Sequence, residues 1–180
     1  ASQGLGKAMA VALAKQGAKV ACVARNAEKL AGTVAEITAA GGIAEAFPCD
    51  VKSRESVEGV VDGVADKWGK LDILVNNAGI TRDARLVKWS DGAPLATMSD
   101  GAFDEVMDVN ARGVFVCTRA VAPVMMAARQ GVILNAASIV GLYGNIGQTN
   151  YAGAKAAVIG MTRTWARELG PHGIRVNAVA

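Results

Sequence analysis

The sequence predicts an α/β protein built on a doubly wound parallel sheet. Short apolar segments of strand character alternate with amphipathic segments of helical period along the chain, as in folds that cover a parallel sheet with helices. Residues 71–75 are almost wholly apolar, which is typical of a parallel strand buried on both faces. Hydrophobic residues make up 52% and charged residues 19% of the chain, a balance that excludes a disordered protein.

The first half of the chain alternates three helices with three strands. Leu5, Met9 and Leu13 share one face of the opening helix, and Gly17 supplies its C-cap. Ser53 is the expected N-cap of a later helix. The predicted elements are the opening helix, a strand at 19–24, a helix at 27–40, a strand at 43–48, a helix at 53–68 and a strand at 71–75.

The second half begins with a segment that lacks a clear period. Residues 76–100 contain Asp91-Gly92, Pro94 and a tryptophan, Trp89, that we expect to be exposed. Long loops of this kind are usually functional or disordered, so we predict an irregular connection here.

Regular structure resumes after this loop. We predict a helix at 99–129 with an irregularity near Gly113 and Pro123, since proline removes a helical hydrogen bond. The remaining predicted elements are a strand at 132–137, a helix at 151–169 and a strand at 174–179.

Charge, hydropathy and cysteine content exclude several classes of protein. The formal charge of +3 is spread along the chain, which argues against nucleic-acid binding. Apolar stretches such as 8–14 are too short to cross a bilayer, so no membrane span is expected. Cys22, Cys49 and Cys117 form no C-x-x-C pair, and we interpret them as reduced core thiols of a cytoplasmic protein rather than metal ligands.

A glycine-rich turn opens the first helix. Ser2-Gln3-Gly4-Leu5-Gly6 combines glycines, which allow close backbone approach, with the free N–H groups of a helix start, which bind anions such as a pyrophosphate. A tight turn without a ligand would use the same residues, and both interpretations stay open at this point.

The residues that follow the next two strands could bind the ribose and the adenine base of an adenosine group. Arg25 can pair with the 2′-phosphate of NADP, and Ala24 offers no carboxylate for the free 2′-hydroxyl of NAD. We therefore predict NADP(H) as the cofactor, with a merely solvated Arg25 as the alternative. Asp50 and Val51 follow the strand 43–48, where the carboxylate can accept from an adenine amino group or cap the next helix.

Two asparagines and a glycine end the strand 71–75. In Asn76-Asn77-Ala78-Gly79 the amides can hydrogen-bond neighbouring strands, and the glycine lets the backbone pass close to a cofactor. A plain turn could also use these residues.

Ser138, Tyr151 and Lys155 form the sharpest candidate site. Tyr and Lys at i and i+4 share one helix face, so the ammonium can lie near the phenol and favour the phenolate form for proton exchange. Ser138, after the strand 132–137, can orient a substrate carbonyl toward Tyr151. A surface Tyr–Lys pair is the alternative, and the rival Tyr143 has no Lys at i+4.

Asn110 lies within the predicted helix 99–129. It could bend the helix and hold a water that links Lys155 to solvent, or be an unfavourable helix residue without a role.

The combined pattern resembles the short-chain dehydrogenase/reductase family. The motifs that carry the resemblance are Ser2 to Gly6, Asn76-Asn77-Ala78-Gly79, Asn110, Ser138 and Tyr151-x-x-x-Lys155. The resemblance implies a Rossmann-type sheet and a tetrad of Asn110, Ser138, Tyr151 and Lys155. Tyr151 would transfer the proton, Ser138 steady the reacting oxygen, Lys155 bind the nicotinamide ribose, and Asn110 support a proton-relay water.

Within the family, two segments resemble the 3-oxoacyl-[acyl-carrier-protein] reductases. These are Gly79-Ile80-Thr81-Arg82-Asp83 and Gly144-Asn145-x-Gly147-Gln148-x-Asn150-Tyr151. The resemblance implies carrier-protein docking through basic residues beside the active-site entrance. Arg129 matches one such position, whereas His172 replaces the usual arginine at the other. The loop 88–98 is longer than usual and either alters substrate choice or is a neutral surface insertion.

The leading hypothesis is NADPH-dependent reduction of a 3-oxoacyl thioester, as in fatty-acid synthesis. A short-chain alcohol or ketone dehydrogenase acting on a small carbonyl or polyol is the alternative, and a non-catalytic nucleotide-binding scaffold is a third. The resemblance also implies a homotetramer. Because the chain opens on the glycine-rich turn and stops inside a strand, we expect a single NAD(P)-binding domain over 1–180 that lacks its first strand and C-terminal part.

Overall fold

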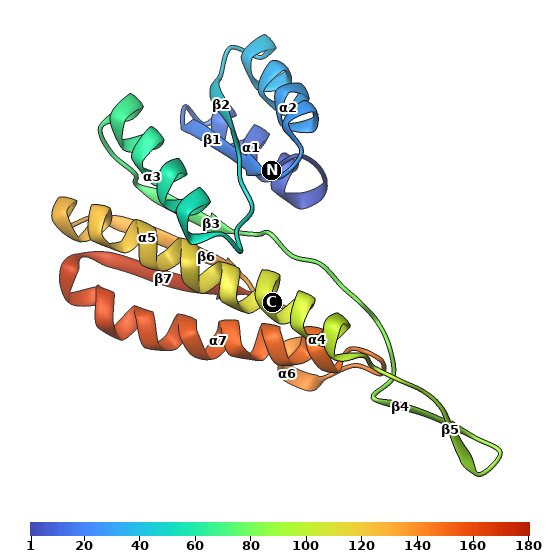
Figure 1. The fold of residues 1–180 in the computed structure, drawn as a ribbon. Coiled ribbons are helices and arrows are strands. Elements are labelled where there is room, and N and C mark those ends of the chain that lie inside the picture. Colours follow the sequence, from blue (N-terminus) through green and yellow to red (C-terminus); the bar gives the residue numbers. More distant parts are fainter. The chain divides into compact units, whose positions relative to one another are not determined.

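The computed structural model describes the whole chain, Ala1–Ala180. It forms two compact units, Ala1–Gly69 and Lys70–Ala180, which we describe one at a time. The expectation of a single domain over 1–180 stays a prediction. Both units confirm the predicted alternation of helices with parallel strands (Figure 1).

The first unit is built around one βαβ motif. Its elements are α1 (Gly4–Lys15), β1 (Lys19–Ala24), α2 (Ala27–Ala39), β2 (Ile43–Pro48) and α3 (Arg54–Trp68). β1 and β2 pair in parallel, with Lys19 opposite Ile43. The N-cap predicted at Ser53 is confirmed, because its side chain accepts a hydrogen bond from the Ser56 N–H.

Small and aliphatic side chains fill the core of the first unit. The buried cluster contains Ala10, Ala14, Cys22, Leu30 and Ile37. Burial raises the pKa of the Cys22 thiol, which agrees with its predicted place in the core.

The second unit holds a three-stranded parallel sheet in the order β3–β6–β7. Its strands are β3 (Ile73–Asn76), β6 (Gly131–Ala136) and β7 (Ile174–Val179). Two long helices, α5 (Gly113–Ala128) and α7 (Thr149–Leu169), run side by side along the sheet (Figure 1). Two short elements, α6 (Val140–Tyr143) and the 3₁₀ turn η2 (Gly170–His172), flank α7 along the chain.

A buried polar ladder ties this sheet to its two long helices. Asn76 Nδ2 donates to Asn135 Oδ1 on β6 at 2.8 Å and to Thr118 Oγ1 on α5 at 3.1 Å. Asn135 Nδ2 then donates to Thr162 Oγ1 on α7 at 2.9 Å. The hydrogen bond predicted from Asn76 to a neighbouring strand is therefore confirmed. The three hydrogen bonds of the ladder supply the polar partners that its buried amides require.

The helix predicted at 99–129 has three parts. They are α4 (Asp100–Met107), the π-helical turn η1 (Asp108–Arg112) and α5. The irregularity expected near Gly113 is confirmed by η1, which ends one residue earlier. The irregularity expected at Pro123 is wrong, since α5 continues through this residue. Pro123 and Arg119, whose carbonyl loses its helical partner, both lie on the exposed side, where water can replace the missing hydrogen bond.

The combined helix is long and apolar enough to meet a criterion for membrane spans. It covers Asp100–Ala128, 29 residues, with a mean hydropathy of 1.3 in its most apolar window. The expectation that all apolar stretches are too short does not hold for this helix. Core packing accounts for part of its apolar character, because Val106, Val116, Val121 and Met125 are buried inside the unit.

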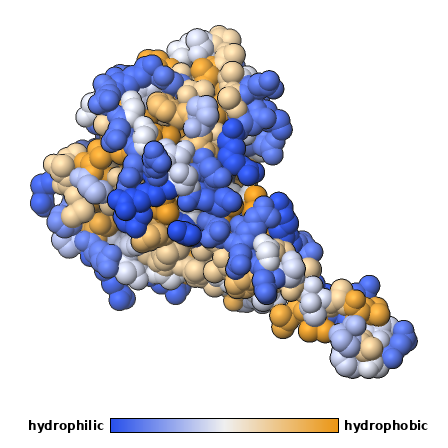
Figure 2. Space-filling model, viewed as in Figure 1, coloured by the Kyte–Doolittle hydropathy of each residue, from blue (hydrophilic) through white to orange (hydrophobic).

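The irregular connection expected at 76–100 is wrong for its second half, which forms a hairpin. The strands β4 (Val87–Ser90) and β5 (Ala93–Thr97) pair antiparallel around Asp91 and Gly92, whose φ angles are +53° and +77°. Positive φ at both turn residues matches the short hairpin turns that Asp-Gly favours. The hairpin extends away from the rest of its unit (Figure 1) and carries hydrophobic residues on its surface (Figure 2), among them Leu86 and Leu95.

Candidate active site

Tyr151 and Lys155 lie on one face of α7, as their spacing predicts. The Lys155 Nζ lies 5.6 Å from the centroid of the Tyr151 ring. Lys155 is 4% exposed, and its ammonium donates to the carbonyl of Ala136, the last residue of β6. Tyr151 is half-buried against a cluster that includes Val106 and Ala154. The pair is therefore anchored at the carboxyl end of the sheet.

Ser138 is brought to the same end of the sheet by the turn after β6. Its Oγ accepts a hydrogen bond from the Val140 N–H at 3.2 Å, at the start of α6. α6 packs on α7 at Gly141, where an added Cβ would lie 2.7 Å from the backbone carbon of Lys155. Only glycine allows this approach, which keeps the Ser138 turn next to Lys155. The rival Tyr143 is 82% exposed.

This close approach predicts the effect of Gly141→Ala. The new methyl group would clash with the α7 backbone, so we expect the free energy of unfolding to fall by about 1–3 kcal/mol. Urea denaturation measures the change. Gly101→Ala in α4 is the matched control, because an added Cβ there meets no atom within 4 Å. Equal stability of the two variants would contradict the predicted contact.

Asn110 lies in η1 and is fully buried. Its Oδ1 accepts from the Ile80 N–H and its Nδ2 donates to the Ile80 carbonyl, both at 2.8 Å. The predicted bend is present as the π-helical turn, a distortion that often marks functional sites. The side chain holds the loop after β3, and its support of a relay water stays a prediction. An added Cβ on Gly79 would lie 3.4 Å from the Asn110 amide oxygen, so the backbone passes close to this side chain.

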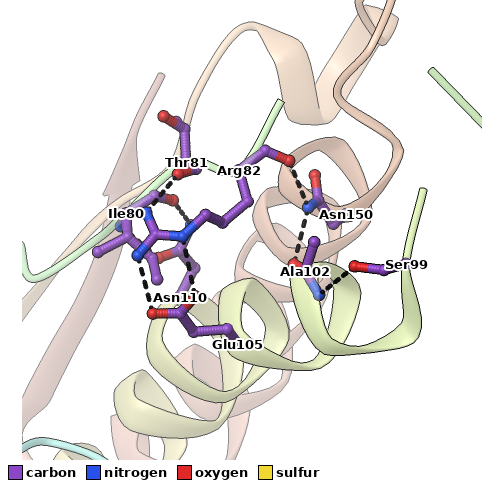
Figure 3. A network of polar contacts seen from close by, with 8 residues as sticks. All are labelled: Ile80, Thr81, Arg82, Ser99, Ala102, Glu105, Asn110 and Asn150. Carbon is purple, nitrogen blue, oxygen red and sulfur yellow. Dashed lines mark hydrogen bonds and ion pairs between the residues drawn. The ribbon is translucent and has the colours of Figure 1, made fainter. Parts of the chain in front are cut away.

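Figure 3 shows a second amide near the site, Asn150, which no sequence pattern marks as a site residue. Asn150 is fully buried and directly precedes Tyr151. It contacts Arg82, which forms a two-bond ion pair with Glu105 on α4 at 2.8 and 2.9 Å. The motif resemblance covered Arg82 and Asn150, but no pattern in the sequence showed that they meet.

The other candidate cofactor residues of this unit follow β3. Asn77 is half-buried, whereas Ala78 and Gly79 are exposed. An exposed backbone next to the buried Asn110 fits the predicted approach of a cofactor to this turn.

The glycine-rich turn lies in the first unit and begins α1. Gly4 has a φ of +56°, and an added Cβ there would meet no atom within 4 Å. Gln3 is the N-cap residue and makes no side-chain cap; its Oε1 instead accepts from Lys29 Nζ at 3.1 Å. No side chain therefore caps the N–H groups of the first turn, which is the arrangement that a bound anion requires. Anion binding by Ser2, Gln3, Gly4, Leu5 and Gly6 stays a prediction.

The adenosine-reading candidates lie at the carboxyl ends of β1 and β2. Arg25 directly follows β1 and is exposed. The half-buried Asp50 accepts from the Lys52 N–H at 3.0 Å, while Ser53 caps α3. The helix-capping interpretation of Asp50 is thus wrong in detail, because the carboxylate closes the turn before the cap. Val51 is half-buried in the same turn.

Burial gives Lys155 an unusual acidity. It lowers the pKa of this ammonium from the ordinary 10.5, because the charged form loses hydration. The folded protein then releases this proton at a lower pH than the unfolded chain does. The contribution of Lys155 to the free energy of unfolding should therefore rise as the pH increases from the folded-state pKa toward 10.5.

Urea denaturation of the protein and of Lys155→Met over a pH series measures this contribution. The difference between the two should grow in favour of the unsubstituted protein as the pH approaches 10.5. Lys70→Met, at an exposed lysine, controls for the general loss of one positive charge. A difference that stays constant with pH would contradict the effect of burial.

The two residues expected at a carrier-docking surface lie close together but not beside Ser138. The Arg129 guanidinium donates to the Pro171 carbonyl at 3.1 Å, next to His172. Arg129 precedes β6 and Ser138 follows it, so they lie about 20 Å apart along this strand. The expectation that Arg129 flanks the entrance is therefore wrong within one chain, because the strand separates them.

Comparison with known sequences identifies the family. The model of the short chain dehydrogenase family matches residues 1–180. The 3-oxoacyl-[acyl-carrier-protein] reductase FabG of Thermotoga maritima is 46% identical over 180 residues, which cover 100% of this chain and 70% of that relative. A 3-oxoacyl-[acyl-carrier-protein] reductase of Synechocystis is 44% identical over 181 residues, with the same coverage of each chain.

Solved structures agree with the sequence comparison. A metagenomic short-chain oxidoreductase in complex with NADP matches with a TM-score of 0.89 and 36% identity, over 99% of this chain and 77% of the other. An NAD⁺-bound xylitol dehydrogenase matches with a TM-score of 0.91 and 34% identity, over 99% of this chain and 66% of the other. The predicted Rossmann-type class is therefore confirmed.

A parallel α/β fold with a glycine-rich turn before a helix and a Tyr–Lys pair at the carboxyl end of the sheet defines a class of nucleotide-dependent oxidoreductases. Within that class, the chain belongs to the short-chain dehydrogenase family.

Proposed function

We propose that the protein reduces a 3-oxoacyl thioester to the 3-hydroxyacyl thioester with NADPH. The observation that carries this proposal is the Tyr151–Lys155 pair, held at the carboxyl end of the sheet beside the Ser138 turn. The names of the 46% and 44% identical relatives support the substrate class. Exposed apolar side chains after Ser138, namely Ile139, Leu142 and Ile146, offer a surface for an acyl chain.

Each unit holds candidate residues for binding the cofactor. The uncapped start of α1 and the open space at Gly4 suit a pyrophosphate. Arg25 would bind the 2′-phosphate, and the NADP complex of a 36% identical structure supports this choice. The remaining cofactor residues would be Ser2, Gln3, Leu5, Gly6, Asp50, Val51, Asn77, Ala78, Gly79, Tyr151 and Lys155. The bound nicotinamide supplies the hydride.

The protein's own side chains would manage the proton and the reacting oxygen. The Ser138 hydroxyl would donate to the substrate carbonyl oxygen, and the Tyr151 hydroxyl would give that oxygen its proton. Lys155 uses one N–H on Ala136, which leaves two donors for the nicotinamide ribose and the Tyr151 oxygen. Asn110 would keep the loop after β3 in place through Ile80.

An assay of NADPH oxidation tests the proposal. The rate with acetoacetyl-CoA is compared with the rates for a panel of simple ketones, and NAD⁺-dependent oxidation of polyols is followed separately. We expect the highest kcat/KM for acetoacetyl-CoA. A preference for a ketone or polyol would favour the alternative, a small-carbonyl or polyol dehydrogenase, which the likeness to xylitol dehydrogenase supports.

We also propose that the enzyme is cytoplasmic and works as a homotetramer. The partly exposed aromatic rings Phe103 on α4 and Phe115 on α5 support a contact between copies along this long helix. Sedimentation equilibrium measures the state, and a monomer at assay concentrations would contradict the proposal.

A further inference from the structure

The Asn150 side chain, directly before Tyr151, makes three hydrogen bonds. Its Nδ2 donates to the backbone carbonyls of Arg82 and Ala102, both at 3.0 Å, and its Oδ1 accepts from the Tyr151 N–H at 2.8 Å. Three segments distant in the sequence thus meet at one buried amide (Figure 3). An amide offers two donor hydrogens and an acceptor oxygen, and both donors are used here.

The contacts of the two other segments make this junction rigid. On the loop, Ile80 is fixed by both atoms of the Asn110 amide, and Arg82 pairs with Glu105. On α4, the helix starts at a cap in which Ser99 Oγ accepts from the Ala102 N–H. The first turn of α7 is therefore fastened by Asn150 to two segments that are themselves held in place.

We infer that Asn150 is a positioning residue that sets where the Tyr151 hydroxyl lies relative to Ser138. It does so through the first turn of α7 and makes no contact with the substrate. This inference rests on the proposed function, in which Tyr151 is the proton donor. Small displacements of a reacting group from its productive geometry lower rates strongly, on the order of 10²-fold for about 1 Å.

The test replaces the amide by groups that lose its donors. Asn150→Ala removes all three hydrogen bonds. Asn150→Asp keeps the acceptor for the Tyr151 N–H but places its second carboxylate oxygen against the two carbonyls. We expect kcat to fall by about 10- to 100-fold in both variants at neutral pH. The Kd for NADPH, measured by fluorescence, should change less than about twofold, since the cofactor surface is untouched.

A pH profile separates positioning from a merely structural role. When the new carboxyl of Asn150→Asp is protonated at acid pH, it can again donate to one carbonyl. The ratio of its kcat to that of the unsubstituted protein should therefore rise as the pH falls, and the ratio for Asn150→Ala should stay flat. The titratable groups on the segments that meet at Asn150 lie on the loop after β3, on α4 and on the first two turns of α7: Arg82, Asp83, Arg85, Asp100, Asp104, Glu105, Tyr151 and Lys155.

Gln130→Glu is the matched control, because it makes the same amide-to-acid change at an exposed residue of the same unit. If Asn150→Asp does not fold, Asn150→Ser, which keeps one donor, is used instead and should lose less kcat than Asn150→Ala. All rates are measured with NADPH and the carbonyl substrate of highest kcat/KM.

The outcomes distinguish this inference from the proposed function. The inference alone would be overturned by an unchanged kcat in the Asn150 variants, or by variants that lose only folded fraction and melting temperature. This holds provided that Tyr151→Phe shows its expected loss of about 10²-fold or more in kcat. Turnover by Tyr151→Phe at the rate of the unsubstituted protein would overturn both. A fall in kcat with acid rescue in Asn150→Asp, at constant Kd for NADPH, supports the positioning role.

Discussion

Tyr151→Phe is expected to lower kcat for carbonyl reduction by about 10²- to 10⁴-fold, the usual contribution of a positioned proton donor. The substitution removes only the hydroxyl. The ring that packs near Val106 and lies 5.6 Å from the Lys155 ammonium remains, so NADPH binding should stay nearly intact. Kinetics of NADPH oxidation and a fluorescence titration with NADPH measure the two quantities.

The matched control is Tyr143→Phe, at a tyrosine that is 82% exposed. It should leave kcat unchanged. Activity of Tyr151→Phe equal to that of the unsubstituted protein would show that the proton comes from another group, and the proposed mechanism would then be wrong.

Arg25→Ala has the second large expected effect, on the choice of cofactor. Charge-assisted hydrogen bonds contribute about 1.5–3 kcal/mol, so we expect the Kd for NADPH to rise by about 10- to 100-fold. The Kd for NADH should change little, because NADH lacks the 2′-phosphate. Isothermal titration with both nucleotides measures the effect.

Lys19→Ala serves as the control for Arg25→Ala. It removes an exposed positive charge at the opposite end of the same strand. Equal affinity for NADPH in Arg25→Ala and the unsubstituted protein, or a native preference for NADH, would contradict the assigned role of Arg25.

The sequence predicted the parallel strands and long helices well because their cores are periodic. In α3, for example, Val57, Val61 and Val64 are buried, as expected for one helix face. The β4–β5 hairpin was missed although Asp91-Gly92 signals such a turn. Every residue of β5 is exposed, so the strand shows no alternation of buried and exposed positions that would have revealed it.

The same contrast holds for the site. The spacing of Tyr151 and Lys155 could be interpreted because both residues lie on one helix. Asn150 could not, because its partners Arg82 and Ala102 are 68 and 48 residues away in the sequence. Contacts of this kind depend on how α4, the loop after β3 and α7 come together, and a local pattern carries no sign of them.

The ladder of Asn76, Asn135, Thr118 and Thr162 also constrains how this unit can vary. A slip of β3 against β6 by one residue would turn Asn76 to the opposite face of the sheet. It would leave three polar groups without hydrogen-bond partners and without water to replace them. Mispaired folding intermediates are thereby penalised. For the same reason, an apolar replacement at one of the four positions would be tolerated only if the other three changed with it. Protein engineers should therefore substitute the four positions together.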